Sequence, residues 1–321
     1  MLNEDKLIAF GPVPSRRLGK SMGINNIPPK FCTYSCIYCQ LGRSLHMQIK
    51  RGEFYNLDEI FPVVKRKVED AIDRNEPIDY LTFVSDGEPT LDINLGREIE
   101  QVKLLGFKVA VISNSSLIWR EDVRDELSKA NLVSLKIDAI SQDIWRRINR
   151  PHRSLELDKI LDGIIKFSKI FKGEMLTESM LIQDVNDSRD EIEKISDFII
   201  KLNSKKSYIS IPTRPPAEKW VKPASEHELN KAYQIFKEKG IDTEYLIGYE
   251  GNEIAFTGNF EQDFLSIVSV HPLREDGVNE LLRKSGENWD LVEDLLTNKK
   301  ILKVEYKNKR YYIRNFKKRK V

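Results

Sequence analysis

The stretch FCTYSCIYCQLG, residues 31–42, contains Cys32, Cys36 and Cys39, the only cysteines in the 321-residue sequence. We call this stretch the cysteine loop. Three thiols cannot all pair within one chain, because one is left over. The sequence also shows no signal peptide and no run of about 18 apolar residues that would span a membrane. The protein is therefore predicted to be cytoplasmic, where clustered cysteines more often bind metals or take part in catalysis than form disulfides.

The spacing of the cysteines leaves two kinds of metal site open. A structural zinc ion takes four protein ligands, and His46 lies near enough in the sequence to complete a Cys3His set. A four-iron cluster is normally held by four thiolates, so three cysteines on one loop leave one iron without a protein ligand. Such an open position lets a metal bind a substrate or cofactor rather than only stabilise a fold.

Outside the cysteine loop, short runs of β-branched and aromatic residues alternate with longer amphipathic segments. The runs predicted to be strands are 80–84, 107–113, 132–140, 174–182 and 208–212, with an earlier strand near 21–27. The segments predicted to be helices are 58–72, 94–105, 121–130, 155–170 and 188–202, with Asn94 and Ser188 as N-caps. This alternation predicts an α/β fold of six β/α units around a parallel sheet, either open or curved into a barrel. Catalytic groups are then expected on the loops that follow the strands.

A different pattern begins at about residue 260. Three short helical stretches are followed by two alternating strands around a turn at 307–309. This order is typical of a winged helix-turn-helix. The sequence therefore predicts two domains, the α/β unit over residues 1–250 and a winged-helix-like domain over residues 251–321.

The spacing Cys-x3-Cys-x2-Cys, with Tyr38 just before the last cysteine, resembles the signature of the radical S-adenosylmethionine (SAM) enzymes. The longer stretch 11–43 resembles a branch of that superfamily related to the tRNA-wybutosine-synthesis type of iron–sulfur oxidoreductase. The resemblance extends over nearly the whole chain and implies a partial (β/α)6 TIM-like barrel. It also implies that Cys32, Cys36 and Cys39 hold a [4Fe-4S] cluster and that SAM binds at the open iron.

The resemblance implies the chemistry as well. The cluster receives one electron, from a donor such as flavodoxin or ferredoxin, and the sulfonium C–S bond of SAM breaks homolytically. The resulting 5′-deoxyadenosyl radical abstracts a hydrogen atom from the substrate. The cofactors supply this chemistry, while the protein positions them and excludes side reactions.

The segment SDGEPTL (85–91) resembles the superfamily's Gly-Gly-Glu segment, which holds the methionine amino group. The resemblance makes Glu88 the acceptor for that ammonium and makes Gly87 a point of close backbone approach. Alternatively, Glu88 simply begins a helix. Asp86 replaces the first glycine of the motif, so its role is open, and a second acceptor is one interpretation.

Further candidates follow the next two strands. Ser113 and Asn114 resemble the ribose-contacting segment, or else cap a loop. Lys136 and Asp138 lie two apart on a predicted strand and so share one side of it. Because unpaired buried charges are costly, a lumen site near the cofactor is favoured over a structural ion pair, and Asp138 is predicted to bind the cofactor together with Tyr38. Additional candidates, each with a structural alternative, are Arg16, Arg17, Arg150, His152, Asn186 and Arg214.

No cysteine remains for a second cluster. The chain therefore departs from the wybutosine-synthesising and sulfur-inserting enzymes, which generally need additional cysteines. This absence argues against the wybutosine reaction itself and predicts one cluster and one hydrogen abstraction.

The charge of the C-terminal segment bears on the substrate. From Lys299 to Val321 there are eleven lysines and arginines and one acidic residue, which suits an RNA backbone. The third helical stretch, which would read a nucleic-acid groove, is instead acidic. A modified tRNA or RNA base is therefore the first expectation for the substrate, and a peptide or protein, including a glycyl-radical partner, is the second. A zinc-containing nucleic-acid-binding regulator is the alternative of another class.

Overall fold

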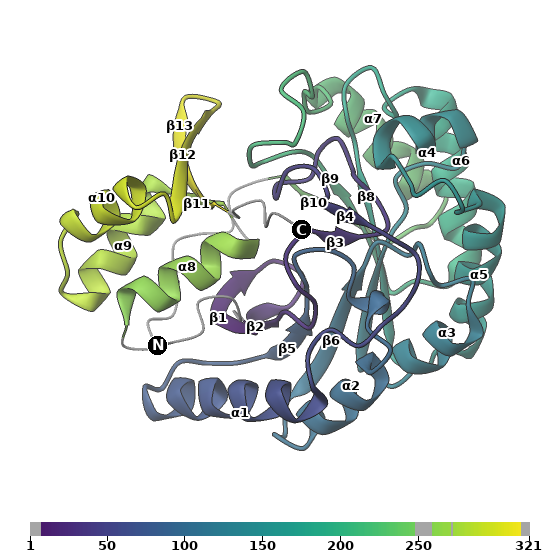
Figure 1. Ribbon diagram of the computed structural model, residues 1–321. Coiled ribbons are helices and arrows are strands. Elements are labelled where there is room, and N and C mark those ends of the chain that lie inside the picture. The colour runs from purple at the N-terminus through teal and green to yellow at the C-terminus, as the bar shows by residue number, and fades with distance from the viewer. Residues whose placement is uncertain (1–7, 248–258, 271, 316–321) are drawn as a thin grey trace.

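The computed structural model describes residues 8–247, 259–270 and 272–315. Its centre is an eight-stranded sheet in the order β1-β2-β5-β6-β7-β8-β9-β10, curled into a half barrel with helices along its outer face (Figure 1). Neighbours from β2 to β10 are parallel, whereas β1 is antiparallel to β2. The predicted partial (β/α) barrel is confirmed.

The sheet contains every strand that the sequence predicted, with two more at its edges. The strands are β1 (Ala9–Ser15), β2 (Gly19–Ile24), β5 (Tyr80–Phe83), β6 (Lys108–Ser113), β7 (Leu132–Lys136), β8 (Glu174–Met180), β9 (Lys206–Ser210) and β10 (Thr243–Leu246). The unpredicted strands are β1, whose sequence AFGPVPS includes two prolines, and β10, which has only four residues. Proline is tolerated in an edge strand such as β1, where one side makes no ladder.

The helices agree with the predicted segments, and two were missed. The helices of the half barrel are α1 (Leu57–Asp73), α2 (Leu95–Lys103), α3 (Glu121–Leu127), α4 (Gln142–Asn149), α5 (Leu157–Ile170), α6 (Arg189–Ile199) and α7 (Glu226–Glu238). The missed helices are α4 and α7. The cap at Ser188 is confirmed, because its side chain accepts from the Glu191 N–H. Asn94 occupies the predicted N-cap position of α2, but its side chain makes no capping bond, and its own N–H donates to Asp92 at 2.7 Å.

The core lies between the sheet and the outer helices. Fully buried side chains of β5, β6 and β7 face the helices, among them Phe83, Val111 and Leu135. Burying each such side chain contributes roughly 1.5–3 kcal/mol, so the strands form a rigid base. The loops at their carboxyl ends are thereby held in fixed positions.

The remaining described elements form a C-terminal unit. They are α8 (Phe260–Val270), β11 (Leu273–Arg274), α9 (Glu275–Ser285), α10 (Asp290–Thr297), β12 (Ile301–Tyr306) and β13 (Lys309–Arg314). The strands form an antiparallel sheet in the order β11-β13-β12. The three helices and the hairpin fall where the sequence predicted them, and β11 is an addition. The winged-helix assignment stays a prediction, and its boundary at residue 250 lies outside the described residues.

The C-terminal unit packs against the half barrel beside β1 (Figure 1). Phe10 and Val13 of β1 share a core with α8, α9, α10 and β12. Lys67 of α1 and Asp263 of α8 form a buried ion pair with a distance of 2.6 Å between Nζ and Oδ1. The hydroxyl of Tyr311 donates to the Thr213 carbonyl, in the loop after β9, at 3.1 Å. The unit is therefore fastened close to the site described below. None of the helices in the described ranges is long and apolar enough to span a membrane.

Candidate active site

The cysteine loop runs from β3 (Phe31–Cys32) toward β4 (His46–Met47), and these two strands lie across the centre of the half barrel (Figure 1). The segment 148–152 runs alongside the loop. The Ser35 N–H donates to the Asn149 carbonyl at 3.1 Å, and the His152 N–H donates to the Thr33 carbonyl at 2.9 Å. One flank of the loop is therefore fixed by main-chain hydrogen bonds.

The end of α4 explains why this segment lies beside the cysteines. Arg150, which follows the last helical residue, has a left-handed backbone with φ of +44°. Pro151 comes next and cannot continue a helix, and it forms a β-bridge with Tyr34. The Arg150 side chain pairs with Glu218. Arg150 and His152, two of the additional candidates from the sequence, are thus placed to support the cysteine loop.

The other flank of the loop contacts the SDGEPTL segment. A Cβ at position 87 would stand 1.6 Å from the carbonyl oxygen of Phe31, which leaves room only for Gly87. The N–H of the next residue, Glu88, donates to the same oxygen at 3.1 Å. The close approach expected at Gly87 is therefore an approach to the cysteine loop itself.

Glu88 is fully buried and is surrounded by donors from the protein. Its Oε1 accepts from the Thr90 N–H at 3.1 Å, from the Thr90 hydroxyl at 2.7 Å and from the Ser113 hydroxyl at 2.8 Å. Its Oε2 accepts from the Asn114 N–H at 2.7 Å. Burial raises the pKa of Glu88, and these hydrogen bonds oppose that rise. Glu88 also caps the short 3₁₀ helix Pro89–Leu91, in agreement with the alternative interpretation from the sequence.

Asn114 turns its side chain toward the cysteine loop. Its Nδ2 donates to Thr33 Oγ1 at 2.9 Å and lies 3.5 Å from Cys32 Sγ, while its Oδ1 accepts from the Ser116 N–H at 3.0 Å. Ser113, through its bond to Glu88, likewise joins two loops. Both residues therefore lie at the cysteine loop, where they bind protein groups.

Asp86 differs from Glu88 in its surroundings. Its side chain is 1% exposed, and both carboxylate oxygens lack a hydrogen-bond partner among the described residues. Burial raises the pKa of Asp86 well above its usual range, although the nearby Lys30 and Arg314 oppose this shift. Asp86 and Lys30 also lie near Cys39. Beside the effect of burial, the Lys30 charge lowers the pKa of Cys39 and the Asp86 charge raises it. Asp86 is thus a buried acceptor beside the last cysteine.

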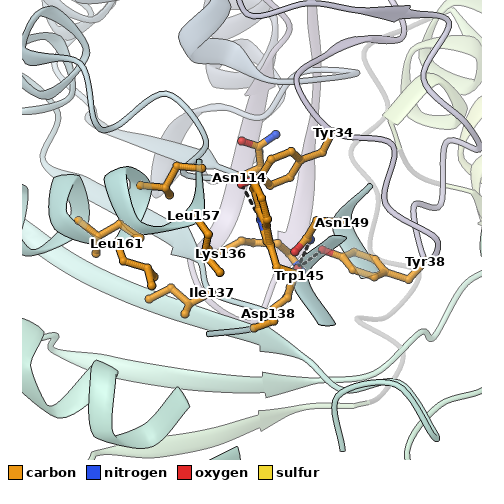
Figure 2. A pocket seen from close by; sticks show the side chains of 13 residues that line it. Tyr34, Tyr38, Asn114, Lys136, Ile137, Asp138, Trp145, Asn149, Leu157 and Leu161 are labelled. Carbon is orange, nitrogen blue, oxygen red and sulfur yellow. Dashed lines mark hydrogen bonds and ion pairs between the residues drawn. The ribbon is translucent and has the colours of Figure 1, made fainter. Parts of the chain in front are cut away.

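Tyr38 and Asp138 meet in the lumen of the half barrel, as Figure 2 shows. The Tyr38 hydroxyl donates to Asp138 Oδ2, which also accepts from Asn149 Nδ2 at 2.8 Å. The Met180 N–H donates to Oδ1 at 2.9 Å. Burial, and next the charge of Asp138, raise the pKa of Tyr38 well above its usual range. The adjoining cavity has a volume of about 20 Å³, room for about one water molecule, so these side chains are packed together.

Lys136 completes the lumen network. Its Nζ lies 3.1 Å from Glu178 Oε1 and 4.7 Å from the centre of the Tyr38 ring. Arg17 pairs with the second oxygen of Glu178. Although burial opposes it, the charges of Lys136 and Arg17 lower the pKa of Glu178 to about 2. The sequence left two interpretations of Lys136 open, a structural ion pair or a place in the lumen near the cofactor. Lys136 forms an ion pair with Glu178, and that pair lies in the lumen.

The weaker candidates from the sequence hold loops in place. Asn186 Nδ2 donates to the Asp138 carbonyl at 2.7 Å, and its Oδ1 accepts from the Ile182 N–H at 2.8 Å. Arg214 Nη1 donates to Gln40 Oε1 at 3.1 Å. The loop after β9 is thereby joined to the end of the cysteine loop.

The cysteines themselves are free thiols. Burial raises the pKa of Cys32 to about 12 and also raises the pKa of Cys36 and of Cys39. Binding a metal must therefore displace protons from these thiols. Over the described ranges, no three Cys, His, Asp or Glu side chains are gathered so as to hold a single metal ion. The ring of His46, the proposed fourth zinc ligand, stacks on Phe31 with 4.4 Å between ring centres.

Comparison with known proteins agrees with this geometry. The family model of the Radical SAM superfamily matches residues 26–199, and the chain belongs to that superfamily. Within it, the chain is 48% identical over 314 residues to UPF0026 protein MJ1312 of Methanocaldococcus jannaschii, a match that covers 97% of each chain. It is also 24% identical over 222 residues to the probable dual-specificity RNA methyltransferase RlmN of Streptococcus pyogenes (strain Manfredo), which covers 66% of this chain and 60% of that protein.

Solved structures share the fold. A radical SAM methyltransferase from Sphaerobacter thermophilus has a TM-score of 0.57 and 15% identity, with 71% of this chain and 66% of that chain covered. TYW1 with a lysine-pyruvate adduct bound has a TM-score of 0.50 and 18% identity, with 69% and 75% covered. At these identities the likeness is one of fold alone.

The superfamily implies a [4Fe-4S] cluster and SAM, and the residues present fit both. Three cysteines lie on one loop that is fixed along two flanks, and amide groups point at two of the sulfurs. Asp86 offers a buried carboxyl group to which no described residue donates a hydrogen bond, and such a group can accept from an ammonium. Cys32, Cys36 and Cys39 would hold the cluster, and Asp86 would face the amino group of SAM.

Sequence reasoning missed three residues of this site. Glu178 could have been found, because it is a charged residue within a largely apolar predicted strand. The same signal singled out Lys136. Lys30 precedes the cysteine loop, but a single lysine carries no specific signal. Asn149 gave none, because it is the last residue of α4, a helix that the sequence did not predict.

Proposed function

We propose that this chain is a single-cluster radical SAM enzyme whose substrate is an RNA. The observation that carries the proposal is the cysteine loop, whose three thiols are the only cysteines and whose flanks are both fixed by neighbouring loops. When bound, the cluster supplies one electron that breaks the C–S bond of SAM, and the 5′-deoxyadenosyl radical takes a hydrogen atom from the substrate.

The chain's own residues position these groups. Gly87 lets the SDGEPTL segment lie directly on the cysteine loop, and Glu88 ties that segment to the loop after β6. Asp86 places a buried carboxyl group beside Cys39, and an ammonium bound there would favour its ionised form. Lys136 and Glu178 neutralise each other in the lumen, so no unpaired charge from this pair faces a radical.

A basic pocket beside the cysteine loop supports RNA as the substrate. Its volume is about 350 Å³, and its lining consists of Met47, Arg146, Arg150, Pro151, His152, Arg153 and Leu155, with no acidic residue. Pro151 bridges to Tyr34, so the pocket adjoins the cysteines. Arginine side chains hold phosphates, which position a nucleic acid without reading its sequence. The similarity to an RNA methyltransferase supports the same substrate class.

The test is 5′-deoxyadenosine formation by anaerobically reconstituted, dithionite-reduced protein. It is run with total cellular RNA and with the same RNA after nuclease digestion. The proposal predicts formation that rises with intact RNA. Formation that is indifferent to digestion would keep the enzyme class and overturn RNA as the substrate.

A matched pair of variants tests the pocket. Arg146→Ala with Arg153→Ala removes two exposed arginines from it, and Arg66→Ala with Arg97→Ala removes two exposed arginines from α1 and α2. The plot of log affinity against log salt has a negative slope. If the pocket binds single-stranded RNA, the Arg146→Ala, Arg153→Ala variant should make that slope less steep by about 1.4, roughly 0.7 for each lost phosphate contact. The second pair should leave the slope unchanged. Equal slopes in both variants would place the RNA elsewhere.

A further inference from the structure

Two side-chain amides point at two different cysteine sulfurs. Asn149 Nδ2 lies 3.5 Å from Cys36 Sγ, and Asn114 Nδ2 lies 3.5 Å from Cys32 Sγ. Both distances are within the range for an N–H···S hydrogen bond. The two asparagines come from different elements: Asn149 is the last residue of α4, and Asn114 directly follows β6.

The orientation of each amide is fixed by its other partners. Asn149 is 3% exposed, and its Nδ2 also donates to Asp138 Oδ2 at 2.8 Å. A carboxylate accepts and cannot donate, so the nitrogen rather than the oxygen of this amide must face it. In Asn114, the oxygen accepts from the Ser116 N–H, which leaves the nitrogen for Cys32. Both sulfurs therefore face N–H groups.

Asn149 has a second effect, because it lies between a sulfur and a negative charge. It contacts both Cys36 and Asp138, and the charge of Asp138 reaches the Cys36 thiol. The Asn149 amide donates a hydrogen bond to the Asp138 carboxylate and so partly offsets its negative charge near Cys36. Without the amide, the carboxylate would repel additional electron density on Cys36 more strongly.

Hydrogen bonds to the sulfurs are one of the factors that set the reduction potential of an iron–sulfur cluster. A donated N–H stabilises negative charge on sulfur, and the reduced cluster carries one more electron than the oxidised one. We propose that Asn149, and to a similar extent Asn114, are positioning residues that raise the reduction potential of the cluster held by the cysteine loop. The inference rests on the proposed function, because it requires the cluster to be bound.

The test is the midpoint potential of the reconstituted cluster, followed by electron paramagnetic resonance during a redox titration. Asn149→Leu keeps the size of the side chain and removes its donors. It should lower the ratio of reduced to oxidised cluster at a fixed potential about tenfold, which is about 59 mV for a one-electron couple. Asn114→Leu should shift the potential in the same direction.

Asn186→Leu is the matched control. Asn186 is also fully buried and also binds Asp138, through the main-chain carbonyl, but no sulfur contact is found for it in the described structure. Its replacement should lower the stability of the fold and leave the potential at the wild-type value. A shift as large as that of Asn149→Leu would mean that loosened packing around Asp138, and not the N–H···S bond, changes the potential.

The remaining outcomes are also decisive. Asn149→Leu and Asn114→Leu proteins that keep their iron and show the wild-type potential would overturn the inference and leave the proposed function intact. Wild-type protein that takes up no [4Fe-4S] cluster would overturn the proposed function itself. If Asn149→Leu does not retain iron, the smaller Asn149→Ala, together with Asn114→Leu, decides the question by the same titration.

Discussion

Gly87 lies directly against the carbonyl oxygen of Phe31, and a Cβ at position 87 would stand 1.6 Å from that oxygen. The contact joins the segment after β5 to the first residue of the cysteine loop. Because the clash would be with backbone atoms, it can be relieved only by moving one of the two segments. The position of the cysteines therefore depends on a residue with no side chain.

Replacing Gly87 by alanine should displace the cysteine loop and lower the iron retained after reconstitution to less than half of the wild-type amount. The matched control is Gly52→Ala, since a Cβ at Gly52 has nothing within 4 Å. Iron content per chain, measured with the thermal midpoint of the metal-free protein, checks the prediction. Wild-type iron in Gly87→Ala would show that the loop adapts without loss.

Replacing Glu88 by its amide should lower stability, whereas replacing Asp86 by its amide should lower the affinity for SAM. Glu88→Gln places an NH2 group among four donor contacts, so the metal-free protein should lose about 1–3 kcal/mol of stability in urea unfolding. Asp86→Asn replaces a buried carboxyl group that makes no hydrogen bond to the described residues, so stability should not fall. Its affinity for SAM should instead fall about tenfold or more, because a charge-assisted hydrogen bond is lost.

Equilibrium dialysis of SAM against the two cluster-loaded variants measures this contrast. Asp86→Asn with wild-type affinity for SAM would show that Asp86 does not face the ammonium. In that case a selective loss of affinity in Glu88→Gln, at unchanged stability, would return the acceptor role to Glu88.

The residues that carry chemistry were easier to predict than the contacts that place them. The cysteine spacing and the SDGEPTL segment pointed to the correct superfamily, since such motifs are local in sequence. The strands of the half barrel were predicted because buried parallel strands are nearly continuous in apolar residues. β1 was missed because its glycine and two prolines read as a loop, although they suit an edge strand.

The partners of the site residues could not be predicted. Ser113 and Asn114 were expected to contact a ribose, but their position relative to Glu88 and Thr33 depends on how two loops from different strands meet. Asn149 ends α4, which was not predicted, and the left-handed backbone that follows at Arg150 is unusual for a non-glycine residue. Such contacts follow from tertiary structure and leave no periodic signal.

Stability should depend on pH through Glu98, which supports the SDGEPTL segment. Its Oε2 accepts from Asn26 Nδ2 at 2.9 Å, and Asn26 in turn accepts from the Ser85 hydroxyl at 2.6 Å. Burial, and next the charge of Asp92, raise the pKa of Glu98 from its ordinary 4.5 to about 9. Between these values the folded protein holds a proton that the unfolded chain has lost, so this contribution to stability is full below pH 4.5 and is lost as pH rises through about 9.

The variant Glu98→Gln removes that titration. Its stability relative to wild type should therefore rise steadily as the pH is raised from 5 toward about 9, as measured by urea unfolding at several pH values. Parallel pH profiles for the two proteins would mean that Glu98 is ionised in the fold across this range.

The attachment of the C-terminal unit can be tested at the buried Lys67–Asp263 pair. Asp263→Leu removes the carboxylate from a buried ion pair and leaves the Lys67 charge buried, so it should lower the free energy of unfolding by about 3–5 kcal/mol. Lys67→Met combined with Asp263→Leu replaces both charges and should recover most of that loss. A double variant no more stable than the single one would show that the ion pair itself is required.

The central claim is that the cysteine loop holds a cluster that cleaves SAM. The most direct measurement is 5′-deoxyadenosine formation by the anaerobically reconstituted, dithionite-reduced protein, compared with Cys36→Ala. The account predicts formation by the wild-type protein, with iron and sulfide bound, and none by the variant. A wild-type protein that carries an intact cluster and forms no 5′-deoxyadenosine from SAM, with or without RNA, would contradict it.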